Sequence, residues 1–589
     1  MITWADRPVR VDAVMRGGGS VRRTSWAGAL ALLVGGALPG SAGAATPPRE
    51  RVVVQAGSVA AAAAAVRAAG GTVLQALPIV DGVAAELPVG ARVAAVVTPD
   101  SPLHPQSTDV LSSAAPTGNV YQQETGVDGL GPAPDGPKLR VALIDTGISK
   151  VGDLGSKIVQ VPDPLTGQPA DCANFSHETS CSDSYGHGTF LAGLIAGGGA
   201  YPGMDPRAEL VSVKIAGRDG AADVSQVLAA IQYVVNFKDA LRIGVLNLSL
   251  GTDSTHDSRS DPLNRAVEKA WRAGIVVVVA ASNRGDAPGT ISKPADDPLV
   301  VTVGAVDDRG TATRWDDQVP AFTGRGPVVE GADGDRFTVY KPDVAAPGVG
   351  LISLVSPGSH IESVAPKSTL GGGAYRRGSG TSQATAVVSG AVALLLERHD
   401  FTPDEVKAAL YVGAHRVDGA PFSAVGAGII DVGASADDAV VQRVQGFRQR
   451  DPEQRDLDGL SLSRAAVQVT AIGCGVLDAR RAADPTCDHV VGQQTALAVD
   501  QVGGTTLRGF DAVQYAADTT WATSGTTSPT GNSWYASQWA QGNSWYGNSW
   551  YGNSWYGNSW YGDDQPASEG ANTPTGTALA GSAWYGVWK

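Results

Sequence analysis

The sequence predicts an α/β protein built on a doubly wound, mostly parallel sheet. From residue 139 to about residue 441, apolar runs alternate with helix-like stretches. The apolar runs lack the polar alternation of half-exposed strands, so they fit strands that are buried on both faces. A small α+β unit precedes this region and a low-complexity tail follows it. A chain of 589 residues has room for several such parts.

The main domain is expected to span residues 135–442. Its strands are predicted at 141–145, 210–215, 244–250, 275–282 and 299–306. Its helices are predicted at 187–196, 224–237, 262–273 and 384–396. Strands that alternate with helices in this way are typical of a doubly wound layout, whose sites lie at the carboxyl ends of the strands.

A separate small unit is expected at 45–110. Strands are predicted at 51–55, 72–76 and 82–87, and helices at 58–69 and 89–97. The order is β-α-β-β-α, with room for a last strand. Residues 109–137 are rich in Ser, Gly, Pro and Asp, so a linker is expected at 111–134.

The beginning of the chain has the layout of a secretory signal peptide, expected at 15–44. Arg16, Arg22 and Arg23 form a positive leader, and an apolar run follows at 26–38. That run is too short to span a bilayer permanently. An uncleaved membrane anchor is the alternative. No other apolar run reaches about 18 residues, so we expect a secreted, extracellular protein without a transmembrane helix in its mature form.

The four cysteines fit an oxidising destination. They fall as two local pairs, Cys172 with Cys181 and Cys474 with Cys487, and each pair is expected to close on itself. Free or metal-binding thiols are the alternative. The spacings lack the C-x₂-C knuckle of zinc sites, which favours disulfides.

Three residues at element edges fit a nucleophilic triad. Asp145 ends a predicted buried strand, where an unpaired carboxylate would be costly. His187 begins an apolar helix, and Ser382 precedes the helix at 384–396, where backbone N–H groups can hold an oxyanion. The serine would attack, the histidine would carry the proton and the aspartate would orient the imidazole. Singly, each residue has a plainer explanation, such as a structural histidine or a helix N-cap.

Taken together, the motifs around these residues resemble those of the subtilisin-like serine peptidases, or subtilases. VALIDTGIS (141–149) is similar to the aspartate motif of this family, YGHGTFLAGLIAG (185–197) to its histidine motif and GSGTSQATAVVSG (378–390) to its serine motif. Residues 341–348 resemble the segment upstream of the serine. The resemblance covers roughly 135–440, and residues 50–105 resemble, more weakly, the inhibitory prodomain of the family.

The resemblance also implies further site residues. Residues 248–251 resemble the strand that hydrogen-bonds the substrate backbone, so Ser249, Leu250 and Gly251 are the expected substrate-binding residues. Asn283 matches the side chain that donates to the oxyanion, beside the Ser382 backbone N–H.

The chain departs from the family pattern at several positions. Gln383 stands where Met is usual, Ala386 where Pro is usual and Ser282 where Gly is usual. We expect these changes to tune activity more than abolish it. No cofactor is expected. The calcium loop after the histidine helix is not recognisable, because residues 197–204 supply no Asn or Asp, and no metal is assigned.

The tail, 531–589, contains four perfect copies of Asn-Ser-Trp-Tyr-Gly at 543–562. A period of five places no single stripe of aromatic residues on a strand or a helix. We therefore expect turns or disorder with exposed rings, which would suit binding to cell-wall polysaccharide. A low-complexity spacer is the alternative. Residues 443–530 are left without an assignment.

The sequence thus predicts a secreted serine endopeptidase that acts on proteins or peptides through an acyl-enzyme and is made as a self-processing zymogen. Its own prodomain is an expected partner. A formal net charge of −14 argues against nucleic acid as a partner. The alternative is a surface-binding protein with a peptidase-like scaffold. A lipase of the α/β-hydrolase type is excluded, because it needs G-x-S-x-G and the order Ser, Asp, His.

Overall fold

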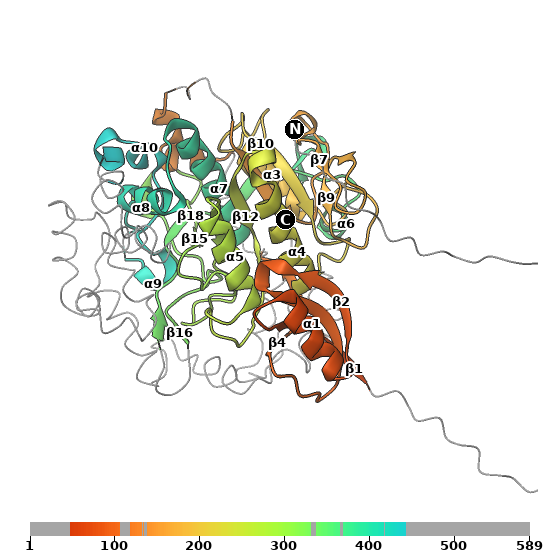
Figure 1. Cartoon of the computed structure of the whole chain (residues 1–589). Helices are drawn as coiled ribbons and strands as arrows, with labels where there is room; N and C mark the ends of the chain where they lie inside the picture. The colour runs from red at the N-terminus through yellow and green to blue at the C-terminus, as the bar shows by residue number, and fades with distance from the viewer. Residues whose placement is uncertain are drawn as a thin grey trace, which may run out of the picture. The chain divides into compact units, whose positions relative to one another are not determined.

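The computed structural model describes residues 48–106, 118–131, 134, 138–330, 337–365, 369–417, 419–442 and 444. Its centre is a seven-stranded sheet in which every pairing is parallel (Figure 1). In sheet order the strands are β18 (Val344–Pro347), β15 (Val301–Val306), β14 (Val276–Ala280), β12 (Ile243–Leu248), β6 (Arg140–Asp145), β10 (Glu209–Lys214) and β9 (Ala173–Asn174). The predicted fold class, a doubly wound α/β sheet, is confirmed.

The chain winds outward from β6 in two directions. After β6 it builds β9 and β10 on one side, then returns to β12 on the other side and continues to β14, β15 and β18. A sheet of this kind forms its ligand site at the carboxyl ends of the strands where the winding reverses. Asp145 ends β6 and Ser249 directly follows β12, so both lie at this edge of the sheet.

Helices cover the sheet (Figure 1). α7 (Thr381–Arg398) packs on β12, β14, β15 and β18, and α3 (His187–Ala196) packs beside it. α4 (Val224–Leu241) and α5 (Pro262–Arg272) pack on each other, α4 against β12 and α5 against β14. Every residue of β12, β14 and β15 is buried, as expected for strands without a solvent face.

The predicted elements of the main domain are all present, with shifted ends. The five predicted strands correspond to β6, β10, β12, β14 and β15. The helix predicted at 384–396 is α7, and it begins earlier, at Thr381. This shift places Ser382 inside the first turn of the helix.

Residues 48–106, which we call the N-terminal unit, form a second sheet of order β2-β3-β1-β4 with α1 packed on it. The elements are β1 (Arg49–Gln55), α1 (Val59–Ala68), β2 (Thr72–Leu77), β3 (Gly82–Pro88) and β4 (Val96–Pro99). The helix predicted at 89–97 is wrong. A turn follows Pro88, and Val96 and Val97 pair with β1 instead. Valine suits such extended backbone, because its branched side chain packs well on a sheet.

The described part of the expected linker, residues 118–131 and 134, contains ordered structure. It includes α2 (Tyr121–Glu124) and a 3₁₀ turn at Val127–Gly129. Tyr121 is fully buried, and its hydroxyl donates to the carbonyl of Pro202 at 2.8 Å. Burial of this ring packs the segment against the main domain. The Ser-, Gly- and Pro-rich composition of the segment did not predict this packing.

Shorter elements complete the described part of the chain, β5 in the N-terminal unit and the others in the main domain. They are β5 (Pro102–Pro105), β7 (Val161–Pro162), β8 (Pro169–Ala170), β11 (Ala222–Asp223), β13 (Leu250–Gly251), β16 (Val328–Glu330), β17 (Phe337–Val339), β19 (Leu351–Leu354), β20 (Thr369–Leu370), β21 (Tyr375–Gly378), α6 (His360–Val364), α8 (Pro403–Gly413), α9 (Phe422–Val425) and α10 (Val432–Ser435). In the described ranges, no helix combines the length and apolar character needed to cross a membrane. The expected signal peptide, the Cys474 and Cys487 pair, nearly all of 443–530 and the repeat tail lie outside the described residues.

Candidate active site

Asp145 and His187 form a buried hydrogen-bonded pair. The imidazole Nδ1 lies 2.8 Å from Asp145 Oδ1 and 2.9 Å from Oδ2. Both side chains are almost completely shielded from solvent. Asp145 Oδ1 also accepts from the backbone N–H of Thr146 at 2.8 Å. A carboxylate on Nδ1 favours the tautomer with the proton on Nδ1, which leaves Nε2 able to accept a proton, and it stabilises a positive charge on the ring.

The approach of α3 to β6 depends on a glycine. A Cβ on Gly188 would lie 2.2 Å from the carbonyl oxygen of Gly147 and 3.1 Å from Asp145 Oδ1. Any larger residue would force α3 away from the strand. The glycine after His187 in the motif therefore allows the histidine to reach the carboxylate.

Asp183 holds the turn that carries His187. Its carboxylate accepts from the backbone N–H groups of Gly186 (2.7 Å) and Thr189 (2.8 Å) and from the Thr146 hydroxyl (2.7 Å). Burial raises the pKa of Asp183, and these hydrogen bonds offset part of that rise. Sequence reasoning missed this residue, although an acidic residue shortly before the helix, four positions before His187, is a recognisable signal.

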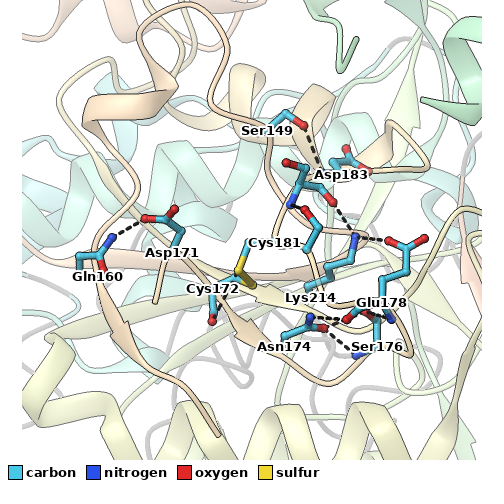
Figure 2. The surroundings of a disulfide bond; sticks show 12 residues. Ser149, Gln160, Asp171, Cys172, Asn174, Ser176, Glu178, Cys181, Asp183 and Lys214 are labelled. Carbon is cyan, nitrogen blue, oxygen red and sulfur yellow. Dashed lines mark hydrogen bonds and ion pairs between the residues drawn. A yellow bond between two sulfur atoms is a disulfide. The ribbon is translucent and has the colours of Figure 1, made fainter. Parts of the chain in front are cut away.

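A buried lysine fixes the loop beside this turn (Figure 2). Lys214 Nζ donates to the carbonyls of Thr146 (3.0 Å) and Ser182 (2.6 Å) and pairs with Glu178 at 3.0 Å. Burial alone would raise the pKa of Glu178, but hydrogen bonds from Ser184 and Lys214 lower it. Lys214 ends β10, within a run at 210–215 that was predicted only as a largely apolar strand, so its role was also missed.

The disulfide predicted between Cys172 and Cys181 is present, and it closes the same loop (Figure 2). Cys181 lies two positions before Asp183. The cross-link therefore joins strand β9 to the turn on which His187 depends.

Ser382 lies in the first turn of α7 and is fully buried. Its hydroxyl donates to the carbonyl of Ser249 at 3.1 Å, and its own carbonyl accepts from the Ser249 hydroxyl at 3.3 Å. Its backbone N–H is one of the donors that an α-helix leaves unused at its N-terminus. The helix dipole favours negative charge at this position.

Asn283 lies three positions after the end of β14. It contacts Thr381, the residue directly before Ser382. Its Oδ1 accepts from the backbone N–H (2.9 Å) and the hydroxyl (3.0 Å) of Thr381. These two bonds fix the amide so that Nδ2 faces away from Thr381. Nδ2 is buried and has no hydrogen-bond partner among the described residues. A fixed, unused donor next to a buried serine N–H can hold a developing oxyanion.

The residue before Asn283 adopts backbone angles that favour glycine. Ser282 has φ = +136°, where a side chain costs of order 1–3 kcal/mol. Its hydroxyl bonds to the carbonyl of Thr290, which helps to hold this conformation. The departure from the usual glycine thus leaves the turn in place.

The other two departures lie on α7. Gln383 is fully buried, and neither atom of its amide has a partner among the described residues. Ala386 lies within the helix, which continues unbroken from Thr381 to Arg398.

A short strand of the N-terminal unit pairs with strands of the main domain beside these residues. β5 is the middle strand of a three-stranded sheet, between β11 and β13. Leu250 pairs with Pro105 and Gly251 with His104 in antiparallel register, and the N–H of Gln106 donates to the carbonyl of Ser249 at 3.1 Å. The predicted substrate-binding residues, Ser249, Leu250 and Gly251, thus pair with an extended segment of the same chain.

The residue that ends this segment reaches the buried serine. The carbonyl of Gln106 accepts from the backbone N–H of Ser382 at 3.1 Å, and its side-chain Oε1 accepts from the N–H of Asn283 at 3.2 Å. Sequence reasoning did not identify Gln106. Across the described ranges, no group of three or more His, Cys, Asp or Glu is placed to hold a metal ion.

The comparisons with known proteins agree with this geometry. Residues 136–428 match the model of the subtilase family of peptidases. Serine protease AprX of Bacillus subtilis (strain 168) is 38% identical over 307 residues, which cover 50% of this chain and 65% of AprX. Subtilisin Savinase of Lederbergia lenta is 31% identical over 267 residues, which cover 45% of this chain and 78% of Savinase.

A solved structure shares the fold. Fervidolysin from Fervidobacterium pennivorans, a keratinolytic enzyme related to subtilisin, superposes with a TM-score of 0.50 at 21% identity, over 66% of this chain and 61% of its own. The chain spans slightly less than two-thirds of AprX, whereas it covers most of Savinase. With the motifs at Asp145, His187 and Ser382 and the similarity to Savinase, the chain belongs to the subtilase family.

Proposed function

We propose that the protein is a serine endopeptidase that hydrolyses peptide bonds through an acyl-enzyme. One observation supports this most strongly. The carbonyl of Gln106, at the end of an extended segment, accepts from the N–H of Ser382, and the Gln106 side chain accepts from the backbone N–H of Asn283. A peptide bound in this way presents its carbonyl carbon to the Ser382 hydroxyl.

Each residue then has a role. Ser382 attacks the carbonyl while His187 accepts its proton, and Asp145 keeps the imidazole in the tautomer that can do so. The Ser382 N–H and Asn283 Nδ2 stabilise the oxyanion of the tetrahedral intermediate. His187 returns the proton to the departing amine, and an acyl group remains on Ser382. A water molecule activated by His187 releases that acyl group.

We further propose that the enzyme is secreted as a zymogen. The signal peptide at 15–44 directs export, residues 45–110 act as an inhibitory prodomain, and residues 135–442 form the peptidase domain. The position of β5 between β11 and β13 supports inhibition, since a substrate strand and β5 would occupy the same groove. The predicted disulfide supports an oxidising destination.

The repeat tail supports a second activity, attachment to the cell wall. Trp and Tyr rings repeat at 543–562 without the spacing of a core, and such rings stack on sugars. Deletion of residues 531–589 should leave peptide hydrolysis intact and abolish co-sedimentation with cell-wall polysaccharide. Equal sedimentation of both forms would assign the tail as a spacer.

Labelling with a peptidyl phosphonate separates an enzyme from a binding protein on a peptidase-like scaffold. The native protein, freed of its N-terminal unit, should be labelled on Ser382. Heat-denatured protein and the Ser382→Ala variant should remain unlabelled. Labelling that is equal in native and denatured protein would contradict an activated nucleophile.

A further inference from the structure

We infer that this peptidase selects glutamine on the amino side of the bond that it cleaves, and that the bond following Gln106 is its own maturation site. The inference rests on the proposed function and specifies its substrate. It depends on the contacts of a single residue, Gln106, which is 3% exposed.

The main chain of Gln106 has the contacts expected of the residue whose carbonyl is attacked. Its N–H donates to Ser249 O at 3.1 Å and its carbonyl accepts from Ser382 N–H at 3.1 Å. The two preceding residues continue the pairing along Leu250 and Gly251. Gln106 directly follows β5, so the register of that strand on β13 places the Gln106 carbonyl at the N–H of Ser382.

The side chain of Gln106 makes two polar contacts of opposite kind, one with the main domain and one within its own segment. Oε1 accepts from the backbone N–H of Asn283 at 3.2 Å, and Nε2 donates to the carbonyl of His104 at 3.4 Å. One end of the amide therefore faces a donor and the other end faces an acceptor. An uncharged amide of this length satisfies both.

Near-isosteric side chains fail one of these contacts. Glutamate would place a carboxylate oxygen against the His104 carbonyl and would bury a negative charge. Methionine would leave the Asn283 N–H without a partner. A buried donor or acceptor left unpaired lowers affinity by about fivefold or more.

The surroundings of this side chain are polar. A Cβ on Gly251 would lie 2.4 Å from Ser292 Oγ, so little space remains directly behind this residue. Thr252 and Arg284, which follow Gly251 and Asn283, line a cavity together with Asp253 and Lys293, and Arg284 pairs there with Asp253. A cavity with charged walls suits a polar side chain better than a large aromatic one.

The first test uses the mature enzyme and peptides that copy residues 103–106. Acetyl-Leu-His-Pro-X-aminomethylcoumarin would be compared with X as Gln, Glu, Met, Phe or Lys. The peptide with Gln should have the highest kcat/KM, at least about fivefold above those with Glu and Met. A higher kcat/KM for Met, Phe or Lys would overturn the inference. If no peptide is hydrolysed and the phosphonate also fails to label Ser382, the proposed function itself is wrong.

The second test follows maturation of the full chain. N-terminal sequencing should find the new end at Ser107 in the wild type, and no processing in the Ser382→Ala variant. Gln106→Glu and Gln106→Met should slow this cleavage by fivefold or more, whereas Gln123→Glu, in α2 and outside the groove, should leave it unchanged. Processing at another bond, with Ser382→Ala still uncleaved, would contradict the maturation site and leave the endopeptidase proposal standing.

Discussion

We propose that the side chain of Asn283 is held in place for the transition state of the reaction. Its oxygen is used twice by Thr381, while its nitrogen stays buried without a partner among the described residues. A buried donor without a partner destabilises the fold. The arrangement is accounted for if the donor is used in the transition state, where charge develops on the substrate oxygen.

Replacing Asn283 by Ala should lower kcat about 100- to 1000-fold and leave KM nearly unchanged, because the lost donor acts on the oxyanion. Steady-state kinetics on a peptide substrate measure both constants. Asn283→Asp is the matched control for folding, since it keeps the acceptor that Thr381 uses and removes the donor. A change confined to KM would show that Asn283 binds the ground state instead.

Gln383 is a second buried amide, but it has no such use. Replacing Gln383 by Met, the residue usual at this position in the family, should raise the free energy of unfolding by about 1–3 kcal/mol, because it removes two buried polar groups without partners. Chemical denaturation of the Ser382→Ala background, which avoids self-digestion, would measure it. Gln383→Glu should have the opposite effect. Lower stability of the Met variant would mean that the amide is satisfied in solution.

At the level of elements, the loop closed by Cys172 and Cys181 supports the histidine. The disulfide spans a sequence separation of 9, for which loop-closure entropy predicts a stabilisation of about 2.5 kcal/mol. The double variant Cys172→Ala/Cys181→Ala should lose about this much stability in thermal or denaturant unfolding. Because Asp183 lies just beyond Cys181, activity should also fall before global unfolding begins. If stability is lost without that earlier loss of activity, the loop does not support the position of His187.

The elements with a long sequence pattern were the ones that could be predicted. β14 and β15 are continuous apolar runs, and α3 begins at the predicted residue. The helix at 89–97 was wrong because alanine and valine in short runs fit either state. β11 and β13, with two residues each, have no periodicity to detect, so the sequence pattern does not predict their pairing with β5.

The site residues that could be predicted were likewise those that lie in a recognisable sequence pattern. Asp145, His187, Ser382 and Asn283 lie in recognisable motifs, and the structure places Asp145 on His187 and links Asn283 to the helix of Ser382. Asp183, Lys214 and Gln106 lie in no recognised motif. Their contacts join segments far apart in the chain, such as Lys214 with Thr146, and depend on the three-dimensional fold.

At the scale of the whole molecule, the N-terminal unit contacts the main domain through more than β5. Asp100 accepts from the backbone N–H (2.7 Å) and the hydroxyl (2.8 Å) of Ser225 at the start of α4. Arg51 pairs with Asp100 at 3.0 Å and with Asp223 at 2.6 Å. A carboxylate at a helix N-terminus is favoured by the helix dipole, so this contact should strengthen docking of the unit.

Deletion of residues 45–110 should slow folding and reduce the yield of active enzyme, because the unit covers the groove and the start of α4. Refolding rates and recovered activity, compared with the full precursor, would measure this. Asp100→Ala in the full precursor should weaken inhibition and leave the kcat of the matured enzyme unchanged. A shortened chain that folds as fast and is as active as the precursor would exclude a prodomain role.

We propose that Ser382 is the nucleophile of a peptidase and that His187 activates it. The most direct measurement is the kcat of matured wild type beside Ser382→Ala, His187→Ala and the double variant, each freed of the N-terminal unit by an added protease. Each single variant should lose roughly 10⁶-fold, and the double variant should lose no more, because the two residues act as one unit. Ser382→Ala that retains more than a few per cent of wild-type turnover would contradict the account.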